Sequence, residues 1–289
     1  MSLLELFCDV DDFWLRFEPQ WKASRLAAGK QRERAGQLCP SEVMTLLIHF
    51  HQSQYRTFKA YYMKYVQIHL NKEFPHLVSY QRFIALIPDL MVPMLAYLQN
   101  RFGACTGISF IDSTSLEVCD PKRISGHRVF AADARRGKTS TGWFFGFKLH
   151  LAVNDRGELL ACCLTPGNVD DRTPVPQLVK KLRGKLFGDR GYISAPLTQL
   201  LFEQGLQLIT RLRKNMKNQL MHLSDKLLLR KRAIIESIID QLKNISQIEH
   251  SRHRSPVNFV VHLIAGLLAY SHQDKKPGLH LDEHALLAA

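Results

Sequence analysis

Apolar residues near the start of the chain recur at helical spacing, and this pattern predicts a helix that ends at Pro19. A second helix is predicted to start at Pro40, where a polar cap and an acidic first turn precede an apolar stripe. Further helical patterns cover residues 55–71 and 80–101. Residues 1–104 are therefore predicted to be all-helical, either as a DNA-end-binding module or as a helical cap.

The pattern changes near residue 106 to alternating apolar and polar positions, which is typical of strands. The expected elements are strands over 107–112, 143–154 and 159–164, a helix over 175–182, a strand over 185–189, a helix over 196–204, a strand over 206–210, and helices over 225–244 and 256–271. Three leading strands predict antiparallel hairpins, and the later strand–helix–strand units predict parallel neighbours. We therefore expect an α/β domain with a mixed sheet over 105–272, followed by a flexible tail over 273–289.

Charge is unevenly spread along the 289 residues. The formal net charge is +13, of which +2 falls in residues 1–100 and +11 in the remainder. Such an excess predicts a polyanionic partner that is met mainly by the second domain. Nucleic acid is favoured over an anionic membrane, because no basic amphipathic helix with an exposed apolar face stands out.

Composition excludes several classes of protein. Apolar residues make up 46% of the chain, which is enough for a sizeable core and excludes global disorder. The start of the chain lacks a basic signal-peptide region, and the apolar run over 258–270 is too short to span a bilayer. Six cysteines without a Cys-x-x-Cys pair predict free buried thiols. We expect a soluble intracellular protein.

Three carboxylates occupy positions that suit catalysis. Asp112 ends one predicted strand and Asp189 ends another, while Glu236 lies on a predicted helix. At 100° per residue, Arg232 and Lys243 lie to one side of Glu236, and both are expected to contact the phosphate backbone of DNA. Converging carboxylates offer the hard oxygen ligands that Mg²⁺ prefers, and a pair of ions suits in-line phosphoryl transfer. Taken singly, each of these acids could equally be a cap or a surface residue.

Other polar residues leave alternatives open. Asp170 or Asp171 could replace Asp189 as a ligand, although a role in ordering their loop is favoured. His150 is expected to be a satisfied histidine of the sheet. The pair His250 and His253 has metal-like spacing without further ligands, so a zinc site is disfavoured. Two basic groups either contact DNA or are simply solvated: Arg135, Arg136 and Lys138 between the first two strands, and Arg213 and Lys214 after the last strand.

Three sequence blocks together resemble the DDE-class insertion-sequence transposases. The blocks are Ile111-Asp112-Ser113-Thr114, then Gly188-Asp189-Arg190-Gly191-Tyr192, then Arg232, Glu236 and Lys243 at spacings of four and seven. Two further stretches, 145–150 and 165–172, resemble the insertion-sequence 982 family in particular. The third block opens with Tyr in related transposases, and that position is Leu229 here.

The resemblance implies an RNase H-like catalytic domain in which Asp112, Asp189 and Glu236 hold two Mg²⁺ ions, with Mn²⁺ as a substitute. It implies a bacterial, cytoplasmic and nucleoid-associated protein that binds terminal inverted repeats and target DNA as a homodimer or higher multimer. Its reaction would be strand cleavage followed by strand transfer. The short spacing between Asp189 and Glu236 leaves no room for a large β insertion. A catalytically inactive DNA-binding derivative and an RNase H-like nuclease are the alternative functions.

Overall fold

The computed structural model describes residues 1–27, 36–139, 142–212, 220–249, 253–279 and 281. The chain divides into two compact units, which we call the helical unit and the sheet unit. The helical unit comprises Met1–Arg101 and Gln241–Asp274, and the sheet unit comprises Phe102–Asp240 and Lys275–Ala289. The first division falls close to the predicted boundary after residue 104. The structure differs from the prediction at the second division, because residues from Gln241 onward join the N-terminal helices.

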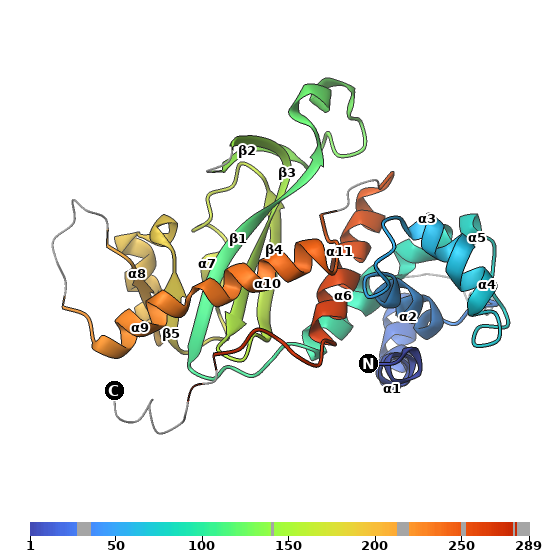
Figure 1. Cartoon of the computed structure of the whole chain (residues 1–289), viewed down its shortest axis with the longest axis horizontal. Helices are drawn as coiled ribbons and strands as arrows, with labels where there is room; N and C mark the ends of the chain where they lie inside the picture. Colours follow the sequence, from blue (N-terminus) through green and yellow to red (C-terminus); the bar gives the residue numbers. More distant parts are fainter. Residues whose placement is uncertain (28–35, 140–141, 213–219, 250–252, 280, 282–289) are drawn as a thin grey trace. The chain divides into compact units, whose positions relative to one another are not determined.

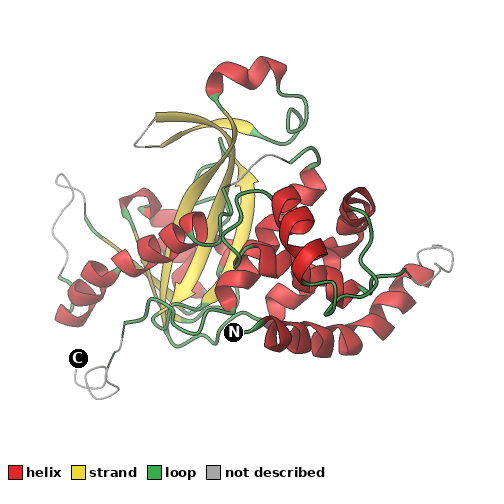
Figure 2. Cartoon of the chain, turned by 45° about the vertical axis from the view of Figure 1, so that its right-hand side comes forward, coloured by secondary structure: helices red, strands yellow, loops and turns green. Residues whose placement is uncertain are grey.

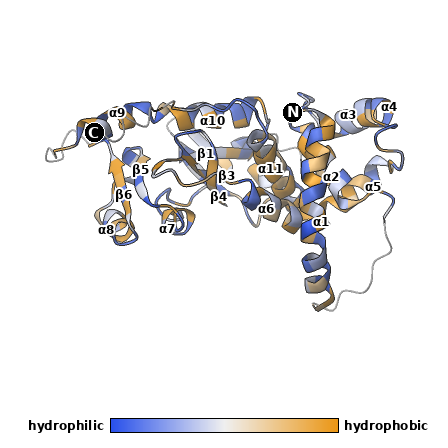
Figure 3. Ribbon diagram, turned by 90° about the horizontal axis from the view of Figure 1, so that it is seen from below, coloured by the Kyte–Doolittle hydropathy of each residue, from blue (hydrophilic) through white to orange (hydrophobic). Residues whose placement is uncertain are grey.

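The helical unit combines the N-terminal helices with α11 from near the end of the chain. Its elements, drawn in red in Figure 2, are α1 (Leu3–Ala27), α2 (Pro40–Phe50), α3 (Phe58–Tyr61), η1 (Tyr62–Val66), α4 (Gln67–His69), α5 (Tyr80–Leu86), η2 (Ile87–Leu90), α6 (Met91–Asn100) and α11 (Pro256–Ser271). Helix α11 is apolar on nearly every side, is coloured mainly hydrophobic in Figure 3, and is buried from Val261 to Ser271. Such a helix requires neighbours all round. It packs on α2 and α6, which supply them.

Helix α1 does not end at Pro19, so that expectation is wrong. The helix continues through the proline to Ala27. A proline inside a helix removes one backbone hydrogen bond and can bend the helix without ending it. The buried residues of α1 all precede Pro19, so the part that follows the proline is not held by the core.

The stretch Tyr80–Asn100 is long and apolar enough, by length and composition alone, to cross a membrane. It consists of α5, η2 and α6 in succession. A buried core helix passes the same test. Phe83, Ile87 and Met94 are fully buried inside the helical unit, as expected for a helix of that kind.

The sheet unit is built on a mixed six-stranded sheet. Its strands are β1 (Ile108–Cys119), β2 (Arg135–Thr139), β3 (Gly142–Asn154), β4 (Leu159–Pro166), β5 (Gly184–Gly188) and β6 (Leu206–Thr210). The order is β2-β3-β1-β5-β6, with β4 also paired to β3. Strand β3 is antiparallel to β1, β2 and β4, whereas β5 is parallel to β1 and β6. The predicted α/β fold with a mixed sheet is confirmed.

Helices cover both faces of this sheet (Figures 1 and 3). Helices α7 (Val175–Leu178) and α8 (Ala195–Glu203) lie on one face, while α9 (Leu223–Lys231) and the first part of α10 (Ala233–Asn244) lie on the other. The core beneath α7 and α8 includes Ile111, Leu186 and Leu201. The helix predicted over 225–244 is two helices, because α9 ends just before Arg232 and α10 begins just after it.

Strand β2 was not predicted, and β1 is longer than expected. The sequence of β2, Arg135–Thr139, is polar and basic, so it lacks the apolar alternation that marks a strand. It is a strand because its backbone pairs with Gly142–Gly146 at the start of β3. The extra length of β1 pairs with the same strand up to Cys119. The short helical turn η3 (Pro121–Gly126) lies between β1 and β2.

Two smaller predictions, that the cysteines are buried and that the tail is flexible, are each only partly met. All six cysteines are free thiols, as predicted, but Cys8, Cys39 and Cys105 are exposed. In the tail predicted over 273–289, the Leu279 amide donates to the Asp155 carbonyl at 2.7 Å, which ties Leu279 to the sheet unit.

Candidate active site

Asp112 and Asp189 come together at the edge where two parallel strands part. The register pairs Phe110 of β1 with Phe187 of β5. Asp112 and Asp189 each follow two residues later, so they lie next to one another. Strand β5 ends at Gly188, whereas β1 continues alongside β3. Asp112 is therefore in mid-strand toward β3 and at the open end toward β5. The negative charge of Asp189 contributes to raising the pKa of Asp112, as expected for neighbouring carboxylates.

Burial and nearby hydrogen-bond donors shift the pKa of Asp112 in opposite directions. Its side chain is only 21% exposed, and this burial is the main reason why the pKa of its carboxyl is raised. Two hydrogen bonds oppose the effect of burial. The Ser113 amide donates to Oδ1 at 2.8 Å, and Arg232 donates to Oδ2 at 2.9 Å. The carboxylate is thus held at both oxygens.

Asp189 is oriented by the turn that follows it. It caps the short helical turn η4 (Arg190–Tyr192), where its Oδ1 accepts from the Gly191 amide at 2.8 Å. A Cβ atom at residue 191 would lie 2.9 Å from that same oxygen, which is closer than real side chains come. Glycine at this position therefore permits the close approach that fixes the Asp189 side chain.

Arg232 links the third candidate acid to the first. It stands at the junction of α9 and α10, where its guanidinium donates to Asp112 and also to Glu236 Oε1 at 2.5 Å. The same guanidinium thus bridges carboxylates from a strand and a helix. Arg232, Glu236 and Asp189 also line a common cavity of about 450 Å³. Leu229, at the position of the family's tyrosine, is a further lining residue and is otherwise buried.

The donor set suits Mg²⁺, because all three candidate ligands are carboxylates with hard oxygen atoms. Within the described part of the chain, however, no three Asp, Glu, His or Cys side chains converge closely enough to hold an ion. Arg232 occupies the position between Asp112 and Glu236. Binding of an ion by these two carboxylates therefore requires the guanidinium to release at least one of them.

Further polar residues surround the acids. Asp171 accepts from the Ser113 hydroxyl at 2.9 Å and pairs with Lys148 at 3.0 Å, which places it beside Asp112 with its charge already matched. Asp170 pairs instead with Arg172. Tyr192 is 1% exposed, and its burial together with Asp112, Asp171 and Asp189 raises the pKa of its phenol. Sequence reasoning did not single out Tyr192, although it ends the second motif block.

His150 is buried on β3 but is only partly satisfied, because its Nδ1 has no hydrogen-bond partner among the described residues. Its burial makes stability depend on pH. Its Nε2 lies 2.8 Å from the Thr165 hydroxyl, and burial lowers its pKa to about 4. The unfolded chain binds this proton near pH 6.5, so stability is fully present above that value and is lost toward pH 4. Urea denaturation at pH 7 and pH 4 measures this effect. Between the two values of pH, the free energy of unfolding of H150Q is expected to fall by about 3 kcal/mol less than that of the parent chain. Equal losses in the two proteins would contradict this assignment.

The predicted DNA-contacting residues fall into three groups. Arg135, Arg136 and Lys138 are exposed on β2, and Lys138 lies over the ring of Trp143, which is itself 63% exposed. Lys243 pairs with Glu249 at 3.0 Å within the helical unit. Arg213 and Lys214 lie outside the described residues, as does His250.

Comparison with family models assigns the chain to a family. The family model described as "Transposase DDE domain" matches residues 102–256, which is more than half of the chain. No curated protein matches. A cryo-EM structure of the piggyBac transposase synaptic complex with hairpin DNA is 12% identical, covering 87% of this chain and 70% of that chain with a TM-score of 0.47. That likeness is too weak to support a conclusion, whereas the family match covers all three candidate acids. The chain belongs to the DDE transposase family.

Proposed function

We propose that this chain is a DNA transposase of an insertion sequence, resembling the insertion-sequence 982 family. It binds terminal inverted repeats and catalyses metal-dependent strand cleavage and strand transfer into target DNA. The observation that carries the proposal is the meeting of Asp112, within β1, and Asp189, just after the end of β5, with Glu236 joined to Asp112 through Arg232.

In this proposal Asp112, Asp189 and Glu236 hold two divalent ions, Mg²⁺ or Mn²⁺. The bound ions would stabilise the charge on the entering and leaving oxygens of the phosphate. The chain's own groups prepare the site. The amides of Ser113 and Gly191 hold the two aspartates in place, and the protonated phenol of Tyr192 lies beside them. Arg232, once released from a carboxylate, is free to meet a phosphate oxygen.

We further propose which basic residues contact DNA. Arg135, Arg136 and Lys138 suit phosphate contact because they are exposed on one short strand, next to an exposed tryptophan. Arg213, Lys214, Arg232 and Lys243 are proposed to contact the backbone as well. The protein would act as a homodimer or higher multimer on DNA in the bacterial cytoplasm, associated with the nucleoid.

A cleavage and joining assay tests the proposed function. The substrate is a labelled duplex carrying the inverted repeat read from the DNA that flanks the gene, and the target is a supercoiled plasmid. In Mg²⁺ or Mn²⁺ we expect cleavage that frees a 3′-OH at the repeat, followed by joined products. Binding without cleavage would identify an inactive DNA-binding derivative. Cleavage without joining would identify a nuclease.

A further inference from the structure

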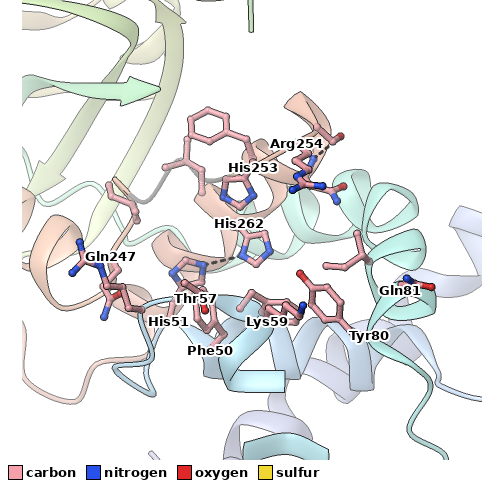
Figure 4. Close-up of a pocket in the computed structure, with 18 residues that line it drawn as sticks. Phe50, His51, Thr57, Lys59, Tyr80, Gln81, Gln247, His253, Arg254 and His262 are labelled. Carbon is pink, nitrogen blue, oxygen red and sulfur yellow. Dashed lines mark hydrogen bonds between the residues drawn. The ribbon is translucent and has the colours of Figure 1, made fainter. Parts of the chain in front are cut away.

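A cavity lies wholly within the helical unit, and its lining includes none of the three candidate acids (Figure 4). Its volume is about 660 Å³, which is within the range of small-molecule pockets. The residues around it come from the end of α2, from α3, from the start of α5, and from the start of α11 with the segment before it. We call it the helical-unit pocket. The proposed chemistry at Asp112 does not use it.

Aromatic rings form much of its wall. His262 packs against Phe50, Phe58 and His253, with ring centroids 5.7, 5.2 and 4.8 Å apart. Tyr80 extends into the same space in Figure 4. Flat rings of this kind offer stacking surfaces for a planar ligand.

Buried His262 contributes a flat surface and not charge. The Ser246 carbonyl can only accept, so His51 must donate to it from Nδ1, at 2.6 Å. In the neutral ring His51 Nε2 is then an acceptor, and His262 Nδ1 donates to it at 3.4 Å. Burial, together with the two neighbouring histidines, lowers the pKa of His262 well below its usual value, so its ring stays neutral.

Positive charge at the pocket comes instead from Arg56, Lys59 and Arg254, which are exposed. Among the residues that the structure describes, none of these three cations has a carboxylate within ion-pair distance. The described lining also contains no Asp or Glu. Unmatched cations beside an aromatic wall suit a ligand that has both a planar body and a negative group.

Two buried amides add polar groups to the lining. Asn258 is 9% exposed, and its Oδ1 has no hydrogen-bond partner among the described residues. The same holds for Oε1 of Gln247. A buried polar atom without a partner is destabilising, and a ligand with hydrogen-bond donors on its edge would satisfy it. The edge of a nucleobase carries such donors.

We propose that the helical-unit pocket binds a single unstacked nucleotide of a DNA strand. Its base stacks against the aromatic wall beside Tyr80, and its phosphate meets Arg254 and Lys59. The inference rests on the proposed function, because it takes DNA as the partner. It adds a second DNA site, separate from the carboxylates, that recognises one unpaired nucleotide.

A bulged duplex tests this site directly. The probe is a DNA duplex with one extrahelical 2-aminopurine, and its control is the same duplex with an abasic residue in the bulge. Stacking on the aromatic wall should quench the 2-aminopurine fluorescence and make the bulged duplex bind about tenfold more tightly than the control. We expect Y80L and R254Q to lose both effects. K64Q removes an exposed cation of the helical unit that does not line the pocket, and it should keep both.

Each further outcome decides against the proposal in a distinct way. Equal binding of the two duplexes without quenching would overturn the nucleotide pocket and leave DNA binding by the transposase intact. Quenching that Y80L and R254Q preserve, in variants with unchanged circular dichroism, would place the nucleotide elsewhere. Failure to bind either duplex would overturn the proposed DNA partner as well. Displacement of the bulged duplex by micromolar free deoxyadenosine monophosphate would identify a site for free nucleotides and not for a DNA strand.

Discussion

D112N, D189N and E236Q are each expected to reduce strand cleavage by at least about a thousandfold, while binding to the inverted repeat stays within a few fold of the parent value. Each change removes a negatively charged oxygen from the site that stabilises charge at the phosphoryl transition state. Affinity comes mainly from phosphate contacts made by basic residues, which these variants retain. Cleavage rates in Mg²⁺ and filter binding of the same labelled duplex provide the two measurements.

Matched variants make this result specific. E203Q neutralises an exposed carboxylate on α8, which covers the opposite face of the sheet, and it should cleave normally. D171N removes the acid that pairs with Lys148 beside Asp112, and we expect it to retain part of the activity. If D189N remains active while D171N is inactive, the second ligand is Asp171 and the assignment of Asp189 is wrong.

R232Q is expected to lower the free energy of unfolding by about 2 kcal/mol in EDTA and by clearly less in Mg²⁺. Arg232 is 20% exposed and bridges Asp112 and Glu236, so its removal leaves a mostly buried carboxylate without its partner cation. In Mg²⁺ the carboxylates have another source of positive charge, so the loss of the guanidinium matters less. Urea denaturation in the two buffers gives both values.

The control for R232Q is K243Q. It breaks the pair between Lys243 and Glu249, which does not involve the three acids, and its effect should be the same in both buffers. An equal loss for R232Q in EDTA and Mg²⁺ would refute competition between the guanidinium and the ion. Phosphate contact by Arg232 is a separate claim. It predicts that the log–log salt dependence of DNA binding falls by about one in R232Q, and an unchanged slope would contradict it.

The placement of Asp112 and Asp189 on neighbouring strands was predictable because each acid follows a short, mainly apolar stretch that is typical of a strand. The prediction that the first strand ends at Asp112 was wrong, because β1 continues to Cys119. The bridge made by Arg232 was not predictable. On a continuous helix Arg232 is simply four residues before Glu236, and only the break between α9 and α10 and the proximity of β1 bring it to Asp112 as well. Arg232 and Asp112 are 120 residues apart in the sequence, and the periodicity of a local segment cannot predict a contact over that separation.

Strand β2 and helix α11 show two different kinds of information that the local sequence pattern does not contain. Residues Arg135–Thr139 are a strand only through backbone pairing with β3, so their side chains give no signal. The bounds of α11 were predicted correctly, but not the unit to which it belongs. An apolar helix shows in its own sequence that it is buried, and it does not show which partners bury it.

The return of residues 241–274 to the N-terminal helices has a consequence for how the protein is made. During translation α2 and α6 emerge long before α11, which packs on both of them. Their apolar surfaces must therefore wait for roughly 150 further residues, about ten to thirty seconds of synthesis. All six strands of the sheet unit lie between these segments and are synthesised before α11. A ribosome that stops before residue 256 would release a chain with an uncovered apolar surface, which chaperones and proteases recognise. Only a chain that includes α11 would escape that surveillance.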